Sequence, residues 1–267
     1  MKLPIALQLY SVRDELEKDF LGTLKKVKDM GYDGVELSGL NGRDPHDVRR
    51  MLDEVGLACP SSHAPVAEQK EVGAFTRYAQ AGVRFVAVPW MDYGNANEHL
   101  RENIETVRIL AEAAAKEGIT LLYHNHDFEF RKINGKAILD ILYEEIPSHL
   151  LQTQLDTCWL KFAGENPITY LKKYAGRAPL VHLKDFWSDG ENGSAPYDLI
   201  GKNAEARKKT NFEFRPIGYG IQDIPAIIKA SEEAGTEWLI VEQDESSVRP
   251  TMEAARMSIE YLHSLQG

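Results

Sequence analysis

The chain has 267 residues, of which 43% are hydrophobic and 27% are charged, as is ordinary for a soluble globular protein. Its formal net charge of −10 argues against a nucleic-acid backbone or an anionic membrane as the main partner, because both are themselves negatively charged. The N-terminal segment lacks a long apolar core before a small-residue cleavage site, and no segment approaches the roughly 18 apolar residues of a membrane span. We therefore expect a cytoplasmic protein.

Eight short runs distributed along the whole chain predict β-strands. Several are nearly continuous apolar runs that end in polar residues, as expected for parallel strands covered by helices. In chain order they are IALQLYS (5–11), DGVELSG (33–39), LACPSSHA (57–64), VRFVAVPW (83–90), ITLLYHNH (119–126), LQTQLDT (151–157), PLVHLKD (179–185) and WLIVEQDES (238–246).

Amphipathic runs between these strands predict helices with recognisable first residues. Asp44 is a predicted N-cap, and Pro45 after it suits the first helical position. Asn166 and Asp223 are expected to begin two further helices, and residues 251–265 predict the last one. Strands and helices thus alternate from one end of the chain to the other.

Eight strand–helix units in a chain of this length predict a single (β/α)8 (TIM) barrel domain over residues 1–267. A doubly wound sheet is the alternative, but its dinucleotide-binding glycine pattern is missing after the first strand. The polar interval 186–216 predicts an insertion between the seventh and eighth strands. A binding loop or lid and a plain surface excursion both remain open for it.

Polar residues collect where the predicted strands end, which is where such barrels carry their active sites. Glu129, Asp156, His182 and Glu242 come from the last four strands, and neighbouring strand ends lie about 4.8 Å apart, so they can share one ion. Three carboxylates and an imidazole suit a divalent cation such as Mn²⁺, Mg²⁺, Co²⁺ or Zn²⁺. Alternatively, the carboxylates cap helices or pair with Lys184, and the histidine is an ordinary barrel residue.

Eight motifs over essentially the whole chain carry a family resemblance: LQLYSVRD, GYDGVEL, SSHAP, YHNHDFEF, LDTCW, VHLKD, PIGYGIQDIP and IVEQDES. With them the chain resembles the xylose isomerase-like TIM barrels. Within these it is most similar to the sugar phosphate isomerase/epimerase group that includes inosose dehydratases and 3-keto-sugar-processing enzymes. The resemblance implies one divalent metal ion bound by Glu129, Asp156, His182 and Glu242.

The chain departs from the family pattern in two places. Many relatives carry the glutamate ligand at the end of the fifth strand, where this chain has Tyr123 and His124. Glu129 is the nearest glutamate, and His124 or His126 is the alternative ligand. Ketose epimerases carry a histidine three residues after the metal-binding aspartate, where this chain has Trp159, which favours the inosose dehydratase and 3-keto-glycoside branch.

The resemblance implies a metal-dependent sugar isomerase or epimerase that acts on a sugar or keto-sugar through a metal-stabilised enediolate. Loss of a β-hydroxyl from the same intermediate would instead make the protein a keto-sugar dehydratase or hydratase, which is a lyase. A non-catalytic sugar-binding protein is an alternative of another class. An endonuclease-type phosphodiesterase shares this barrel, but the net charge of −10 argues against it.

Particular side chains are expected to carry the chemistry. Those expected to transfer protons are Glu129, Glu242, His124, His126 and Lys184, the last of which could instead form a buried ion pair with Glu36 or Asp156. Those expected to contact substrate are Gln8, Tyr10, Glu36, His63, Trp90 and Trp159, although aromatic residues at such positions are often simply core.

The expected partner is a small-molecule carbohydrate, with no nucleic acid and no membrane, and a homo-oligomer is left open. Gly218 and Gly220 could present amide groups to an anion near the usual phosphate site of the barrel, but a tight turn is favoured for them. No sugar phosphate is therefore predicted.

Overall fold

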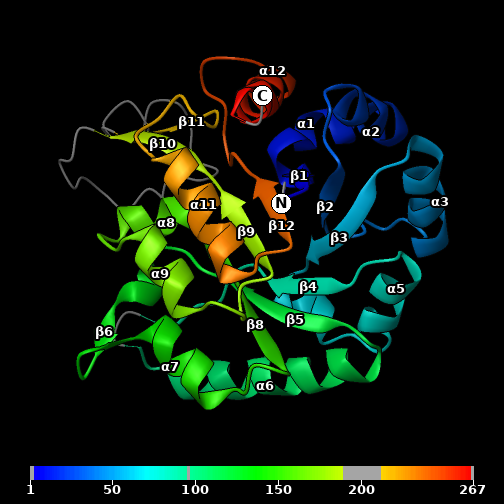
Figure 1. Cartoon of the computed structure of the whole chain (residues 1–267). Helices are drawn as coiled ribbons and strands as arrows, with labels where there is room; N and C mark the ends of the chain where they lie inside the picture. The colour runs from blue at the N-terminus through cyan, green and yellow to red at the C-terminus, as the bar shows by residue number, and fades with distance from the viewer. Residues whose placement is uncertain (1–2, 95–96, 189–211, 266–267) are drawn as a thin grey trace.

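The computed structural model describes residues 3–94, 97–188 and 212–265. Eight parallel strands close into a barrel in the order β1-β12-β9-β8-β5-β4-β3-β2, and the helices surround it (Figure 1). The strands are β1 (Ile5–Gln8), β2 (Gly34–Ser38), β3 (Ala58–His63), β4 (Phe85–Val88), β5 (Thr120–His124), β8 (Leu151–Asp156), β9 (Leu180–Leu183) and β12 (Trp238–Val241). All eight predicted strands are confirmed, and so is the (β/α)8 barrel.

One or more helices follow each barrel strand. The helices are η1 (Leu9–Val12), α1 (Arg13–Leu16), α2 (Phe20–Asp29), α3 (Pro45–Val55), α4 (Val66–Gln69), α5 (Ala74–Gln80), α6 (Leu100–Lys116), η2 (Phe128–Phe130), α7 (Ile138–Glu145), α8 (Thr157–Phe162), α9 (Pro167–Lys173), α11 (Ile224–Ala234) and α12 (Thr251–Ser264). The predicted caps Asp44, Asn166 and Asp223 each accept hydrogen bonds from backbone N–H groups of the first turn. Within the described residues, no helix has the length and apolar character needed to cross a membrane.

Two small antiparallel hairpins follow barrel strands β5 and β9. The first pairs β6 (Lys132–Ile133) with β7 (Lys136–Ala137), and the second pairs β10 (Asp185–Ser188) with β11 (Phe212–Arg215). The second hairpin holds the two ends of the interval 186–216, in which an insertion is predicted. Residues 189–211 of that interval lie outside the described residues.

The barrel interior changes from apolar to polar along the strands. A buried apolar cluster made by interior side chains contains Ala6, Phe85, Ala87, Leu122, Leu180 and Ile240. Side chains two residues apart on a strand face the same side. Gln8, His124, His182 and Glu242 follow four of these residues by two positions, so they continue the same interior columns toward the C-terminal ends of the strands.

Candidate metal centre and active site

Four side chains at the C-terminal end of the barrel interior bring possible metal-ligating atoms together. His124, Asp156, His182 and Glu242 each offer one such atom, and these atoms lie within 4.8 Å of one another. His182 Nδ1 lies 2.8 Å from Glu242 Oε2, and His124 Nε2 lies 3.8 Å from Asp156 Oδ2. The structure thus brings together three of the four expected metal ligands, with His124 beside them. We call His124, Asp156, His182 and Glu242 the metal group.

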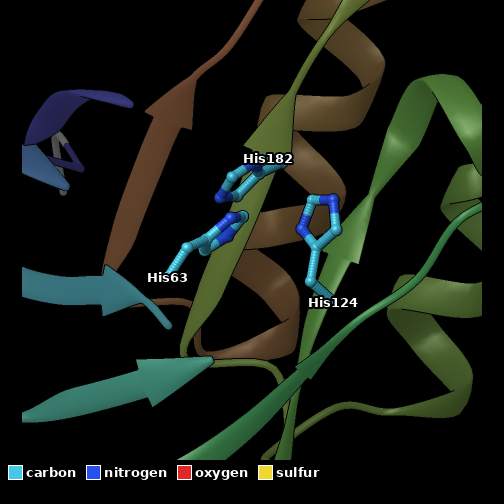
Figure 2. Close-up of side chains that lie close together, drawn as sticks. All are labelled: His63, His124 and His182. Atoms are coloured by element: carbon cyan, nitrogen blue, oxygen red, sulfur yellow. The ribbon is translucent and has the colours of Figure 1, made fainter. Parts of the chain in front are cut away.

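A third imidazole joins these two histidines. His63 stacks on His182 with ring centroids 5.2 Å apart, and His124 meets both rings edge-on (Figure 2). The ring nitrogens of the three histidines form a second group that could hold a metal. His63, expected to contact substrate, therefore borders the metal group, and its side chain is 12% exposed.

Asp156 combines a structural role with a place in this group. Its Oδ1 accepts hydrogen bonds from the backbone N–H groups of Cys158 and Trp159, which caps helix α8. Its buried Oδ2 lies 3.0 Å from the ammonium of Lys184 and 3.8 Å from His124 Nε2. One carboxylate oxygen therefore anchors the helix, while the other faces the positive charge of Lys184.

Lys184 lies in the centre of the acidic residues and is itself buried. Its Nζ is 3.0 Å from Asp156 Oδ2, 2.8 Å from Glu242 Oε2 and 3.0 Å from Asp244 Oδ2. Burial alone would lower the pKa of Lys184, but attraction by the three carboxylates raises it well above its ordinary value. Of the two ion pairs considered for Lys184, the structure shows the one with Asp156.

His182 is held between two carboxylates. Its Nδ1 faces Glu242, and its Nε2 lies 2.8 Å from Glu36 Oε1. Burial opposes protonation, yet Glu36 and Glu242 together raise the pKa of His182 to about 10. Lys184 and His182 in turn lower the pKa of Glu242 well below its ordinary value, against the effect of its burial. The positive charges of His182 and Lys184 are therefore both held by neighbouring carboxylates.

Glu129, expected as the fourth ligand, lies outside this group of atoms. Its Oε1 accepts a hydrogen bond from the Tyr123 hydroxyl, and its Oε2 accepts one from the backbone N–H of His126, each at 2.8 Å. Burial raises the pKa of Glu129 to about 8. Side-chain alternation explains the placement, because Tyr123 and His124 face opposite sides of β5 and the η2 turn carries Glu129 to the side of Tyr123.

His126 is a buried, neutral imidazole close to the group. Its ring stacks on Phe128 at 5.4 Å and lies 5.5 Å from the ring of Trp159. Burial, followed by the positive charge of Lys184, lowers the pKa of His126 well below its ordinary value. A neutral imidazole has a lone pair that can accept a proton, as expected of a general base.

The residues expected to contact substrate fall into two sets. Gln8, Glu36 and Trp159 are fully buried; the first two hydrogen-bond to each other, and Trp159 packs against Phe212 and Phe214 as a core residue. The other set is more accessible, and it consists of His63, half-buried Tyr10 and Trp90, which is 43% exposed. Tyr10 also borders a groove of about 520 Å³ that Arg13, Phe20, Ser38 and Arg43 help to line.

Asp185 directly follows Lys184 and was not among the residues expected at the site. Its Oδ2 accepts hydrogen bonds from the backbone N–H groups of Gly218 and Gly220, both at 3.0 Å, and its Oδ1 accepts one from Gln222. A Cβ on Gly220 would lie only 2.2 Å from Asp185 Oδ1. The amides considered for an external anion therefore bind this carboxylate; the sequence signal was the acidic residue directly after VHLK.

Comparisons with known proteins identify the family of the chain and its fold. The model of the xylose isomerase-like TIM barrel family matches residues 24–265. Inosose dehydratase from Clostridium botulinum is 32% identical over 148 residues, which are 53% of this chain and 46% of that protein, so the match spans about half of each.

Solved structures show the same barrel. A sugar phosphate isomerase/epimerase from Parabacteroides distasonis has a TM-score of 0.78 at 22% identity, with 99% of this chain and 94% of that chain covered. The crystal structure of the IolI protein, which holds a zinc atom, has a TM-score of 0.71 at 14% identity, with 98% of each chain covered. By its family match over residues 24–265, this chain belongs to the xylose isomerase-like TIM barrel family.

Proposed function

We propose that the protein is a divalent-metal-dependent isomerase or epimerase of a sugar or keto-sugar. The observation that supports this most directly is the convergence of His124, Asp156, His182 and Glu242 at the active-site end of the barrel. The named relatives of the chain are enzymes of this kind and a dehydratase.

The donor atoms fit one divalent cation. Two imidazoles and two carboxylates suit Zn²⁺, Mn²⁺ or Co²⁺ better than Mg²⁺, which prefers oxygen ligands. Asp156 Oδ2 is buried and already faces the Lys184 ammonium at 3.0 Å, so it is an oxygen suited to contact a cation. When bound, the cation would act as a Lewis acid toward adjacent carbonyl and hydroxyl oxygens of the substrate.

Three side chains of the site are suited to proton transfer. Glu242, whose lowered pKa keeps it ionised, and His126, whose lowered pKa keeps it neutral, can each take the proton α to the carbonyl. Lys184 stays protonated and can donate a hydrogen bond to the oxygen on which charge develops. The contacts of Glu129 with Tyr123 and His126 support a role in holding the loop rather than in proton transfer.

The substrate we propose is an unphosphorylated carbohydrate. The backbone amides of Gly218 and Gly220, which were considered for an external anion, donate to Asp185 instead. Asp156, Glu242 and Asp244 lie within 3.0 Å of Lys184 Nζ, and these carboxylates would repel a phosphate dianion.

Exchange of substrate protons with solvent tests the proposal. The metal-loaded protein is incubated in D2O with a panel of neutral keto-sugars, and proton NMR follows the hydrogen α to the carbonyl. We expect exchange, and we expect His126→Gln to slow it by about 10²- to 10⁴-fold while metal binding is kept. Glu68→Gln is the matched control, because Glu68 accepts a hydrogen bond from the Tyr78 hydroxyl away from the metal group. No exchange with any sugar of the panel would favour a non-catalytic sugar-binding protein.

A keto-sugar lyase is the second candidate, and the identity with inosose dehydratase favours it. Both reactions begin with removal of the same α-proton, so the same site residues serve either one. The products distinguish them, since a lyase releases the β-hydroxyl as water and leaves an unsaturated or diketo product in the NMR spectrum.

A further inference from the structure

A layer of buried polar side chains lies directly beneath the metal group. Strand register places Gln8 of β1 beside Glu36 of β2, and Glu36 beside Ser61 of β3. Gln154 of β8 pairs in register with His124 of β5 and reaches Glu36 across the barrel interior. Every side chain of this layer is at most 2% exposed. Bulk solvent therefore does not reach them.

Glu36 accepts four hydrogen bonds within this layer. Its Oε1 accepts from Gln8 Nε2 at 2.5 Å and faces His182 Nε2 at 2.8 Å. Its Oε2 accepts from Ser61 Oγ at 2.5 Å and from Gln154 Nε2 at 2.6 Å. Two carboxylate oxygens offer about four lone-pair directions, so this carboxylate is saturated.

These contacts determine which nitrogen of His182 faces the metal group. An ionised carboxylate is only an acceptor, so the Nε2 that faces Glu36 must carry a proton. The other nitrogen, Nδ1, is the one that points toward Glu242. Nε2 is thus held by Glu36 beneath the group, and Nδ1 is the nitrogen on the side of Glu242, where a metal ion would bind.

The same carboxylate orients His124 indirectly, through the side chain of Gln154. Because Glu36 accepts from the amide NH2 of Gln154, the carbonyl Oε1 of Gln154 must face the other way, toward His124 Nδ1 at 3.1 Å and His63 Nε2 at 2.7 Å. That oxygen is an acceptor, so His124 Nδ1 carries the proton and Nε2 keeps the lone pair. Nε2 is the nitrogen that faces Asp156.

We propose that Glu36 is the positioning residue of the metal site, which fixes the tautomer and ring orientation of His182 directly and of His124 through Gln154. The inference rests on the proposed metal-dependent function. A hydrogen bond from the second nitrogen of a ligating histidine to a carboxylate fixes the ring and increases the basicity of the ligating nitrogen. Here one fully buried carboxylate serves two imidazoles from different strands, and its Oε1 also lies 3.2 Å from His63 Nε2.

Glu36→Gln tests the proposal by metal binding rather than by activity. The glutamine amide would turn an NH2 group toward two of the four donors, so the layer can no longer satisfy all of them. We expect the affinity for Zn²⁺ or Mn²⁺, measured by calorimetric titration of the chelator-treated protein, to fall by about 10- to 100-fold. Glu36→Asp keeps the charge and should recover part of the loss, and Glu68→Gln, the same substitution outside the layer, should leave affinity unchanged.

A spectroscopic measurement separates positioning from a merely structural role. Long-range ¹H–¹⁵N NMR of the histidine rings should show His124 protonated on Nδ1 in the wild type, and a mixture of tautomers in Glu36→Gln. If Glu36→Gln does not fold, Gln154→Met is measured instead. This variant should change the tautomer of the His124 ring and leave the tautomer of the His182 ring unchanged.

The outcomes distinguish this inference from the function it rests on. A folded Glu36→Gln protein with wild-type metal affinity and unchanged ring tautomers would overturn the positioning role and leave the metal-dependent function standing. A wild-type protein that binds neither Zn²⁺ nor Mn²⁺ would overturn the function itself and the positioning role with it.

Discussion

The fourth side chain of the metal group shows how a single residue can be assigned from strand geometry. His124 occupies an interior position, whereas Glu129 is bound by Tyr123 and by the backbone of His126. We therefore expect His124→Leu to weaken metal binding by more than about 100-fold, beyond the usual effect of an outer partner. Glu129→Gln should stay within about threefold of the wild type, because it removes no ligand. Calorimetric titration measures the metal affinity of both variants. A larger loss of affinity in Glu129→Gln than in His124→Leu would show that Glu129 is the fourth ligand.

The buried carboxyl of Glu129 should give stability a pH dependence of unusual sign. Burial raises its pKa from 4.5 to about 8 in the folded protein, so between these values the folded state keeps a proton that the unfolded chain has released. Stability contributed by this group is present below about pH 4.5 and decreases as pH rises to about 8, by up to about 1.4 kcal/mol per pH unit. Glu129→Gln lacks this ionisation. We therefore compare the free energies of unfolding of both metal-free proteins in urea at pH 5 and pH 8. Relative to the wild type, the variant should be more stable at pH 8 than at pH 5. A difference that is the same at both pH values would contradict the raised pKa of Glu129.

At the scale of elements, regular strands and capped helices were predictable and the hairpins were not. Local signals suffice for a helix that begins at Asp44, because the cap and the first turn are adjacent in sequence. The pairing of Asp185 with Arg215 joins residues 30 positions apart, and no local pattern encodes it. The same holds for the two-residue strands β6 and β7, which are too short to show an alternation.

The loop before α11 should depend on Asp185 for its conformation. Asp185→Asn would replace one of the two acceptor oxygens by an NH2 group facing backbone N–H donors, such as those of Gly218 and Gly220. Two donors without an acceptor should lower the free energy of unfolding by about 2 kcal/mol or more. Asp223→Asn is the matched control, because asparagine caps a helix about as well as aspartate. Equal stability of the two variants in urea unfolding would show that the loop does not need the Asp185 carboxylate.

The whole barrel explains both what was foreseen of the site and what was missed. A closed ring of parallel strands brings Asp156, His182 and Glu242 to one end, so their convergence follows from the fold class alone. The fold class does not determine how deep each strand-end side chain lies inside the barrel. Strand register and packing across the barrel decide whether such a residue contacts substrate or lies below the site. Glu36 was expected at the surface of the site and lies buried beneath it for that reason.

Metal binding should stabilise the molecule as a whole, because the four side chains come from β5, β8 and β9 and from the end of β12. A ligand that binds only the folded state at 100 times its dissociation constant adds about 2.7 kcal/mol of stability. For a domain of this size we expect the midpoint of thermal unfolding to rise by about 5–10 °C with Zn²⁺ or Mn²⁺ and to return when a chelator is added. His124→Leu should show little rise at the same metal concentration. An equal rise in both proteins would place the binding elsewhere, since the variant lacks one of the four side chains of the proposed site.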